Sequence, residues 1–242
     1  MTLLEMVNDA RKKAHIRQGT ISTVAGATGI IADLTMWVQD SWEDLQKESL
    51  NWWFRTKIDA TTTLSASTDQ YAMPADLESI NWRTVSIYET VGVDEVPLSF
   101  IPYEEWRMRK DLYNTSEARP VLVTERPDTK IHVWPFPDKT YTLRYDGVYA
   151  IDEMTDDADT PGDTISAGTQ LLPDQYHDVL VWDAVRRYAA VHEDGATLER
   201  AQKRFLAAHN RLKERHTPEV YIKPGILTGR KGYVANVRGY WR

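Results

Sequence analysis

The spacing of the apolar residues changes twice along the chain, and this change most limits the folds available to it. Apolar side chains recur at helical spacing within 1–51 and again within 173–216. Between them, 52–151 contains short segments rich in β-branched residues, separated by turn-forming sequences. A strand repeats every two residues and a helix about every 3.6, so one element cannot satisfy both patterns. We therefore predict an α+β fold, in which a helical bundle from the N- and C-terminal helices carries an inserted antiparallel β-sandwich or small barrel.

The two ends of the chain are expected to supply four helices. The first is predicted to begin after Thr2, which can cap it, and to close near Gly19. A second is expected over about 27–50. The C-terminal pair occupies 173–216, where Gly195 ends one helix and a second follows. Because the link between them is short, we expect this pair to lie antiparallel.

The middle region is predicted to be mostly strands. Its segments alternate or cluster Val, Ile, Thr and Tyr, which fit a pleated sheet. A short helix is expected at about 103–113. The predicted strands are 54–64, 84–88, 121–124, 130–134 and 140–145.

The stretch 152–172 is predicted to be a solvated acidic loop. Residues 152–170 contain six acidic residues and neither Lys nor Arg. Asp157 and Asp159 resemble the start of a calcium-binding loop, but Gly168 stands where such a loop needs its bidentate Glu. We therefore expect no calcium site in this loop.

The last 26 residues, 217–242, have a composition unlike the rest of the chain. They carry five basic residues against one acidic residue, with many apolar side chains but no helical or strand repeat. Such a segment cannot bury these side chains by itself, so we predict an extended arm that docks on another protein. The candidate docking residues are Tyr221, Ile226, Leu227, Arg230, Lys231, Tyr233, Val237, Arg238, Tyr240 and Trp241.

Composition excludes several classes of function. The net charge of −7 disfavours a dedicated DNA-binding protein, which would carry a basic face. The absence of Cys excludes disulfides, thiolate chemistry and zinc–cysteine sites. No apolar stretch approaches the ~20 residues that span a bilayer, and the first residues do not resemble a signal peptide. We therefore expect a protein that is soluble in a cytoplasm and does not bind a membrane.

Motifs of catalytic sites are also missing from the sequence. It contains no phosphate-binding loop and no GxSxG motif, and its six His residues are scattered and expected at the surface. Glu104 and Glu105 are adjacent, so they cannot face each other across a cleft as glycosidase carboxylates do. We predict no enzymatic activity, no cofactor and no metal. Two alternatives remain: a carbohydrate-binding or host-recognition module using Trp82, Trp106 and Trp134, and a hydrolase whose site the sequence does not reveal.

Several short motifs occur in an order that is similar to a known family. LLEMVN opens the chain, WVQDSWEDLQ ends the second predicted helix, and WWF follows it. DQYAMPAD, IHVWPFP, YTLRY and LPDQYHD come later, in that order, and each is weak alone. Together they resemble the head-to-tail adaptor, or connector, proteins of tailed bacteriophages over about residues 2–215.

This resemblance implies a structural virion protein rather than an enzyme. Such adaptors form a ring, typically of twelve copies, beneath the portal protein of the head. The ring extends the DNA channel without sequence-specific DNA binding and carries the tail or nozzle protein. The protein would thus be found in the host cytoplasm during assembly and at the head–tail junction of the virion. In similar proteins a C-terminal extension reaches the portal, and here that role would fall to 217–242.

A ring needs two different contact faces on each copy. The second predicted helix has an acidic polar face, and the last helix has a basic one. These faces are therefore candidates for the contact between neighbouring copies. The candidate ring-interface residues are Asp40, Glu43, Asp44, Arg200, Arg204 and Arg211.

Overall fold

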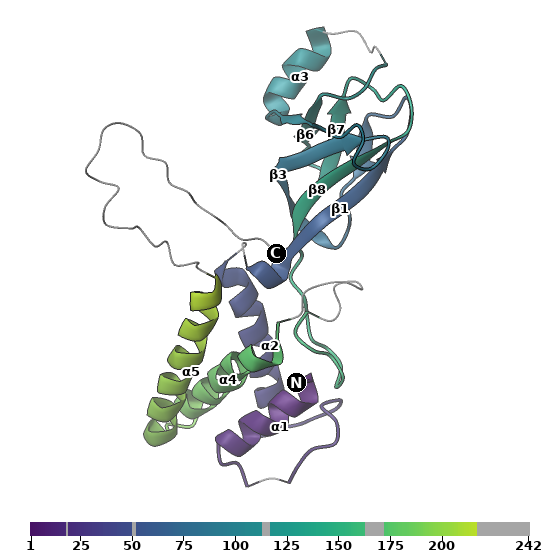
Figure 1. Cartoon of the computed structure of the whole chain (residues 1–242). Helices are drawn as coiled ribbons and strands as arrows, with labels where there is room; N and C mark the ends of the chain where they lie inside the picture. Colours follow the sequence, from purple (N-terminus) through teal and green to yellow (C-terminus); the bar gives the residue numbers. More distant parts are fainter. Residues whose placement is uncertain (18, 50–51, 113–116, 163–171, 217–242) are drawn as a thin grey trace, which may run out of the picture. The chain divides into compact units, whose positions relative to one another are not determined.

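The computed structural model describes the chain apart from residues 18, 50–51, 113–116, 163–171 and 217–242 (Figure 1). The predicted docking arm therefore lies outside the described residues. The chain divides into two compact units. We call residues 1–41 with 173–216 the helical unit, and residues 42–172 the β unit. The division falls inside a single helix, between Ser41 and Trp42.

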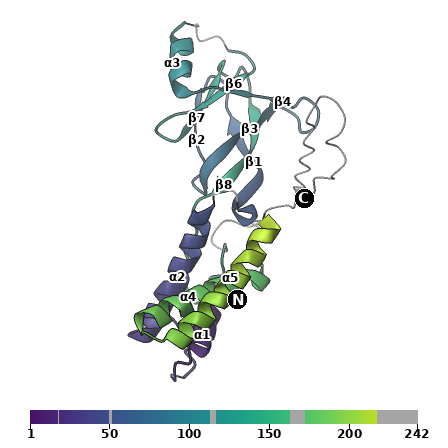
Figure 2. The same ribbon diagram turned by 90° about the vertical axis from the view of Figure 1, so that its left-hand side faces the viewer.

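The helical unit contains the elements of both chain ends. It comprises α1 (Leu3–Lys13), most of α2 (Ile30–Glu48), a 3-10 turn η2 (Asp174–Tyr176), α4 (Asp178–Val191) and α5 (Gly195–His216). Figure 2 shows α4 and α5 running alongside each other.

The start of α1 is confirmed and its end is not. Thr2 accepts a hydrogen bond from the Glu5 amide while the Glu5 side chain accepts one from the Thr2 amide, which forms a capping box. The helix ends at Lys13, well before Gly19. His15 takes a left-handed conformation (φ 55°), which stops the helix. Gly195 also differs from expectation, because it is the first residue of α5.

The core of the helical unit forms around α4, which is buried on most of its surface. Leu180, Val181 and Ala184 are fully buried. A polar cluster lies beside them, where the buried Asp183 carboxylate accepts a hydrogen bond from Ser41 Oγ (2.8 Å). The same carboxylate forms ion pairs with Arg186 and Arg187. A buried carboxylate needs such partners, and these bonds attach α4 to α2.

The β unit contains two four-stranded sheets. The first has the strand order β1-β8-β3-β4 and the second has the order β2-β7-β6-β5. The strands are β1 (Thr56–Leu64), β2 (Gln70–Ala72), β3 (Leu77–Tyr88), β4 (Val96–Pro97), β5 (Ser99–Phe100), β6 (Leu122–Glu125), β7 (Lys130–Trp134) and β8 (Tyr141–Tyr149), with η1 (Trp53–Arg55) before β1 and α3 (Tyr103–Leu112) between β5 and β6.

This arrangement confirms the α+β class, excludes the barrel alternative and corrects the expectation of antiparallel pairing throughout. The described residues form two separate sheets, and these sheets do not close into a barrel. The pairing is not wholly antiparallel either, because β5 pairs parallel to β6. Both strands of that pair are short at the contact, and α3 supplies the crossover connection that a parallel pair requires.

The core of the β unit is built from inward-facing residues of both sheets. Strand β8 confirms the strand predicted at 140–145 but continues to Tyr149, with strict alternation of buried and half-buried residues. Strand β3 is longer than predicted and is interrupted, because its pairing with β8 shifts between Asn81 and Ser86. The residues between them arch away from β8. Trp82 in this arch stacks on Phe100 of the second sheet, with ring centroids 5.1 Å apart, so the arch connects the two sheets.

Three polar residues predicted at the surface are instead buried. His132 and His177 are both buried. His132 packs edge-on against Trp106 under α3, at 6.0 Å between ring centroids. Asp152, at the start of the acidic stretch, is also buried. The hydrogen-bond partners of Asp152 account for its burial, and together with Asp152 they form the first feature of the candidate site.

Candidate functional site

A buried polar cluster closes the base of the β unit. Gln46 Oε1 accepts from the Asp152 amide, and Gln46 Nε2 donates to the Asp152 carbonyl, each at 2.8 Å. The Asp152 carboxylate accepts from Trp42 Nε1 (3.1 Å) and from the Gly162 amide (2.8 Å). A buried carboxylate is stable only with such donors. The chain entering the β unit is thus bonded to the chain leaving it.

Arg55 extends this cluster toward the first sheet. Its guanidinium donates to the carbonyls of Gln46 (2.9 Å) and Tyr149 (2.6 Å) and forms an ion pair with Glu78. The last carbonyls of a helix lack partners within the helix, and Gln46 is in the last turn of α2. Arg55 therefore caps α2 and joins it to the end of β8.

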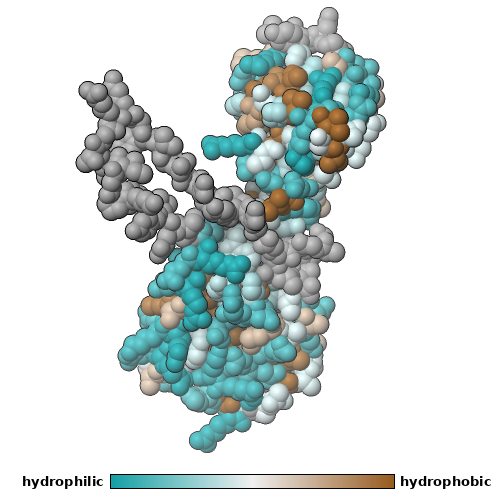
Figure 3. All heavy atoms as spheres, viewed as in Figure 1, coloured by the Kyte–Doolittle hydropathy of each residue, from teal (hydrophilic) through white to brown (hydrophobic). Residues whose placement is uncertain are grey.

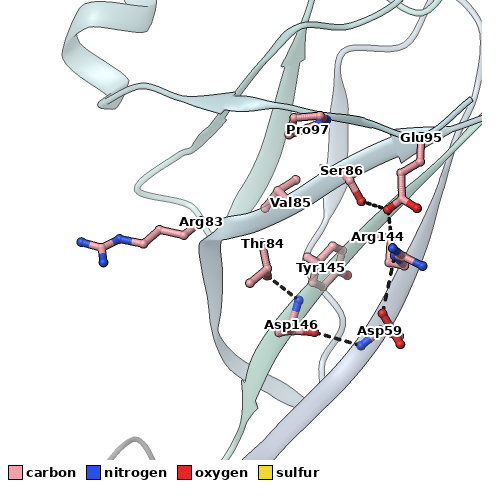
Figure 4. A pocket seen from close by; sticks show the side chains of 10 residues that line it. All are labelled: Asp59, Arg83, Thr84, Val85, Ser86, Glu95, Pro97, Arg144, Tyr145 and Asp146. Atoms are coloured by element: carbon pink, nitrogen blue, oxygen red, sulfur yellow. Dashed lines mark hydrogen bonds and ion pairs between the residues drawn. The ribbon is translucent and has the colours of Figure 1, made fainter. Parts of the chain in front are cut away.

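A pocket of about 390 Å³ lies over the interrupted part of β3 (Figure 4). Arg144 stands in it between two carboxylates, those of Glu95 (2.5 Å) and Asp59 (3.5 Å). Asp146 accepts from the Asp59 amide, and Thr84 accepts from the Asp146 amide. These groups satisfy one another, which indicates that the pocket stabilises the arch rather than binding a ligand. Its lining consists of Asp59, Arg83, Thr84, Val85, Ser86, Glu95, Pro97, Arg144, Tyr145 and Asp146.

The basic half of the predicted ring interface forms a stripe on α5. Arg200, Arg204, Arg211 and Arg215 are all exposed, and their spacing places them on one side of the helix. Arg200 already has partners inside the chain, since it bonds to His15 Nε2 (2.9 Å) and donates to a carbonyl of α1 (2.8 Å). The stripe therefore offers Arg204 and Arg211 to a neighbour more readily than Arg200.

The acidic half of the predicted interface is partly engaged within the chain. Asp40 lies 3.8 Å from Arg187, and Glu43 pairs with Lys47 one turn further along α2. Asp44 is exposed. The sequence pattern did not reveal these internal pairs, which reduce the charge that α2 can present to another copy.

Two of the three tryptophans of the carbohydrate-binding alternative, Trp82 and Trp106, do not form an open platform. Trp106 is buried, so its ring is not available to stack on a sugar. Trp82 stacks on Phe100 and donates its indole N–H to Glu125 (3.1 Å). These two rings therefore pack within the β unit itself.

One exposed feature was missed from the sequence. The loop between β3 and β4 exposes Val91 and Val93, and such a turn ordinarily carries polar residues. A Val-Gly-Val sequence at a turn was the available signal. Figure 3 shows hydrophobic residues on the β unit gathered in separate patches, while the visible face of the helical unit is largely hydrophilic.

Charge is distributed unevenly between the parts of the chain. Residues 42–172 contain 24 acidic and 12 basic residues, whereas 1–41 and 173–216 together contain 11 acidic and 12 basic residues. The negative charge of the protein therefore belongs to the β unit. Neither a cluster of three metal-binding side chains nor a helix able to cross a membrane occurs in the described part of the chain.

Comparison with known families agrees with the order of the motifs. The family model described as SU10 adaptor protein matches residues 1–225, which is most of the chain. A comparison with curated proteins gives no match. A match of this extent covers the helical unit, the β unit and the start of the C-terminal segment. The chain therefore belongs to the SU10 adaptor protein family, and is a bacteriophage adaptor with a structural role in the virion.

Proposed function

We propose that the chain forms a ring beneath the portal protein, extends the DNA channel and provides the platform to which the tail attaches. The observation that carries this proposal is the family match over residues 1–225. The number of copies, twelve, follows the resemblance to head-to-tail adaptors. DNA would cross the ring during ejection.

The charge of the β unit supports a channel that does not hold DNA. Its excess of 12 acidic residues repels phosphates, whereas a protein that binds DNA places Lys and Arg against them. DNA can thus pass without being held and without recognition of its sequence. The arginine stripe on α5 would then face a protein rather than the DNA.

For the ring itself, we propose that the stripe on α5 contacts the acidic face of α2 in the next copy. Such a contact joins two different surfaces, as a closed ring requires. Arg204 and Arg211 are exposed and suited to this contact, and Asp44 is one of the exposed acidic residues of α2. Asp40 and Glu43 also have partners in their own chain, Arg187 and Lys47, which reduces the charge that they present to a neighbouring copy.

Residues 217–242 are proposed to dock on the portal. They follow α5 directly and carry five basic residues and one acidic residue. An extended chain covers at most about 3.5 Å per residue, so 26 residues could reach on the order of 90 Å. This is long enough to cross from one subunit to another in an adjacent ring.

The decisive experiment measures the mass of the chain alone and mixed with its portal protein, by light scattering after gel filtration. The proposal expects a monomer or weak oligomer alone and a stable ring in the mixture. A chain that remains monomeric with the portal and does not co-elute with it would refute the proposal.

Two variants test the two contacts separately. Removal of 217–242 should leave the fold intact and abolish portal binding; unfolding of the shortened chain would show that the segment belongs to the core. The double change Arg204→Glu and Arg211→Glu should prevent ring closure. Lys203→Glu is the matched control, because Lys203 is exposed on the same helix but pairs with Glu199 in its own chain. Unchanged ring formation by the double variant would exclude the proposed interface.

A further inference from the structure

The loop joining β3 to β4 exposes two large apolar side chains at its tip. Val91 is 68% exposed and Val93 is 78% exposed, the highest values among the large hydrophobic residues of the described chain. They flank Gly92, whose positive φ of 72° lets the chain turn. A turn that only connected two strands would normally carry polar residues, so these valines need another explanation.

The loop is held in one conformation by Asp94. Its carboxylate accepts hydrogen bonds from the amides of Thr90 (2.9 Å) and Glu89 (3.1 Å). The amide of Val93 also donates to the carbonyl of Thr90 (3.2 Å). The bond from Thr90 is the main reason that the pKa of Asp94 lies below its usual value. The backbone on both sides of the tip is therefore fixed.

A second set of contacts attaches the loop to the rest of the β unit. Arg119, distant in sequence, donates to the carbonyls of Ile87 (3.0 Å) and Asp94 and lies near the Asp94 carboxylate. Its guanidinium also lies 5.7 Å from the ring centre of Tyr141. Because the loop is already ordered, docking it on a partner would cost little conformational entropy.

We infer that Val91 and Val93 form a preformed apolar tip that inserts into a hydrophobic pocket with a basic rim on the tail component of the phage. This inference rests on the proposed function. An adaptor must bind two different neighbours, and the portal is assigned to residues 217–242. The tip belongs to the β unit, whose 24 acidic and 12 basic residues favour a basic partner. The same charge disfavours docking on the β unit of another copy.

The test uses the full-length chain bound to its portal, with tails purified from the same phage. Val91→Thr combined with Val93→Thr keeps the shape of both side chains and replaces one methyl group of each with a hydroxyl. Val191→Thr is the matched control, because Val191 is 63% exposed but lies at the end of α4 in the helical unit. Sedimentation would measure tail binding, and gel filtration would measure ring formation and portal binding.

The inference expects the double variant to bind tails about tenfold or more weakly than the control, with ring formation and portal binding unchanged. Tail binding within twofold of the control would overturn it. Loss of ring formation or of portal binding in the double variant would also overturn it, because the tip would then belong to another interface. If the proposed function is wrong, the unaltered chain itself fails to form a ring or to bind its portal.

A second variant tests whether the order of the loop matters. Asp94→Asn removes the charge that holds the Thr90 and Glu89 amides and leaves both valines in place. Amide exchange in the loop should become faster, and tail binding should weaken less than in the valine variant. Faster exchange with unchanged tail binding would show that the preformed conformation does not contribute to docking.

Discussion

Replacing Arg55 by Met should strongly destabilise the β unit, because its guanidinium is buried against backbone carbonyls. The Arg55 side chain is 1% exposed and donates to the carbonyls of Gln46 and Tyr149. A buried carbonyl that loses its donor costs about 1–3 kcal/mol. Glu78 is well exposed and can be hydrated when its partner is lost, so it adds little. Two such carbonyls give an expected loss of about 2–6 kcal/mol.

The matched control for this change is Arg144→Met. Arg144 also has two acidic partners, Glu95 and Asp59, but its side chain is 35% exposed. Water can solvate those carboxylates when the guanidinium is removed, so the expected loss is about 0–1 kcal/mol. The two variants therefore differ mainly in the burial of the groups that are left without a partner.

Urea unfolding followed by tryptophan fluorescence would measure both free energies. Trp52 is buried close to Arg55 in the sequence and reports on this region. A smaller change, Arg55→Lys, keeps the charge but not the planar group that reaches two carbonyls, so it should fall between the other two variants. If Arg55→Met and Arg144→Met differ by less than about 1 kcal/mol, the buried cluster does not stabilise the base of the β unit.

Other changes test different parts of the structure. Gly147→Ala should cost roughly 1–3 kcal/mol in thermal unfolding, because the added Cβ would lie 2.9 Å from a leucine side chain of β3; Gly19→Ala, with no neighbour within 4 Å, should be nearly neutral. Asp183→Asn should cost about 1–3 kcal/mol by weakening its bonds to Ser41 and the α4 arginines, measured by urea unfolding. Because the folded pKa of Asp94 is depressed, its contribution is present above the pKa of the unfolded chain and is lost as the pH falls through the folded value. The protection of the loop amides, taken as the exchange rate of an unfolded peptide at the same pH divided by the measured rate, should therefore fall only on acidification below about pH 4.

The regular elements could be predicted because their patterns are local. The capping box at Thr2 and the alternation of β8 depend on neighbouring residues alone, and the cap and the strand were both identified from the sequence. The parallel pairing of β5 and β6 could not be identified, because it depends on where a crossover connection returns the chain. The arch after Asn81 depends in the same way on a distant stacking partner, Phe100.

The candidate site was harder to predict, because its charges are balanced by partners far away in the sequence. The sequence around Asp152 has the composition of a solvated loop. Asp152 is nevertheless buried, because it forms hydrogen bonds with Trp42 and Gln46, which lie more than 100 residues earlier in the chain. Asp40 looked available on its helix, but Arg187 lies beside it. Residue type and spacing identify which groups are charged, and only the fold identifies which of them are already paired.

The paired hydrogen bonds between Gln46 and Asp152 also have an evolutionary consequence. Everything between these two residues forms a closed loop of chain, and the loop begins and ends at the same bonded pair. We expect such an insertion to be exchangeable as a unit, because the bonds that fasten it involve Gln46 and Asp152 and not its strands or loop tips. A phage could thus alter what its adaptor carries without redesigning the helices on which the adaptor is built. Grafting the insertion of a related adaptor between these two positions, followed by unfolding of the chimera, would test whether the fastening is sufficient.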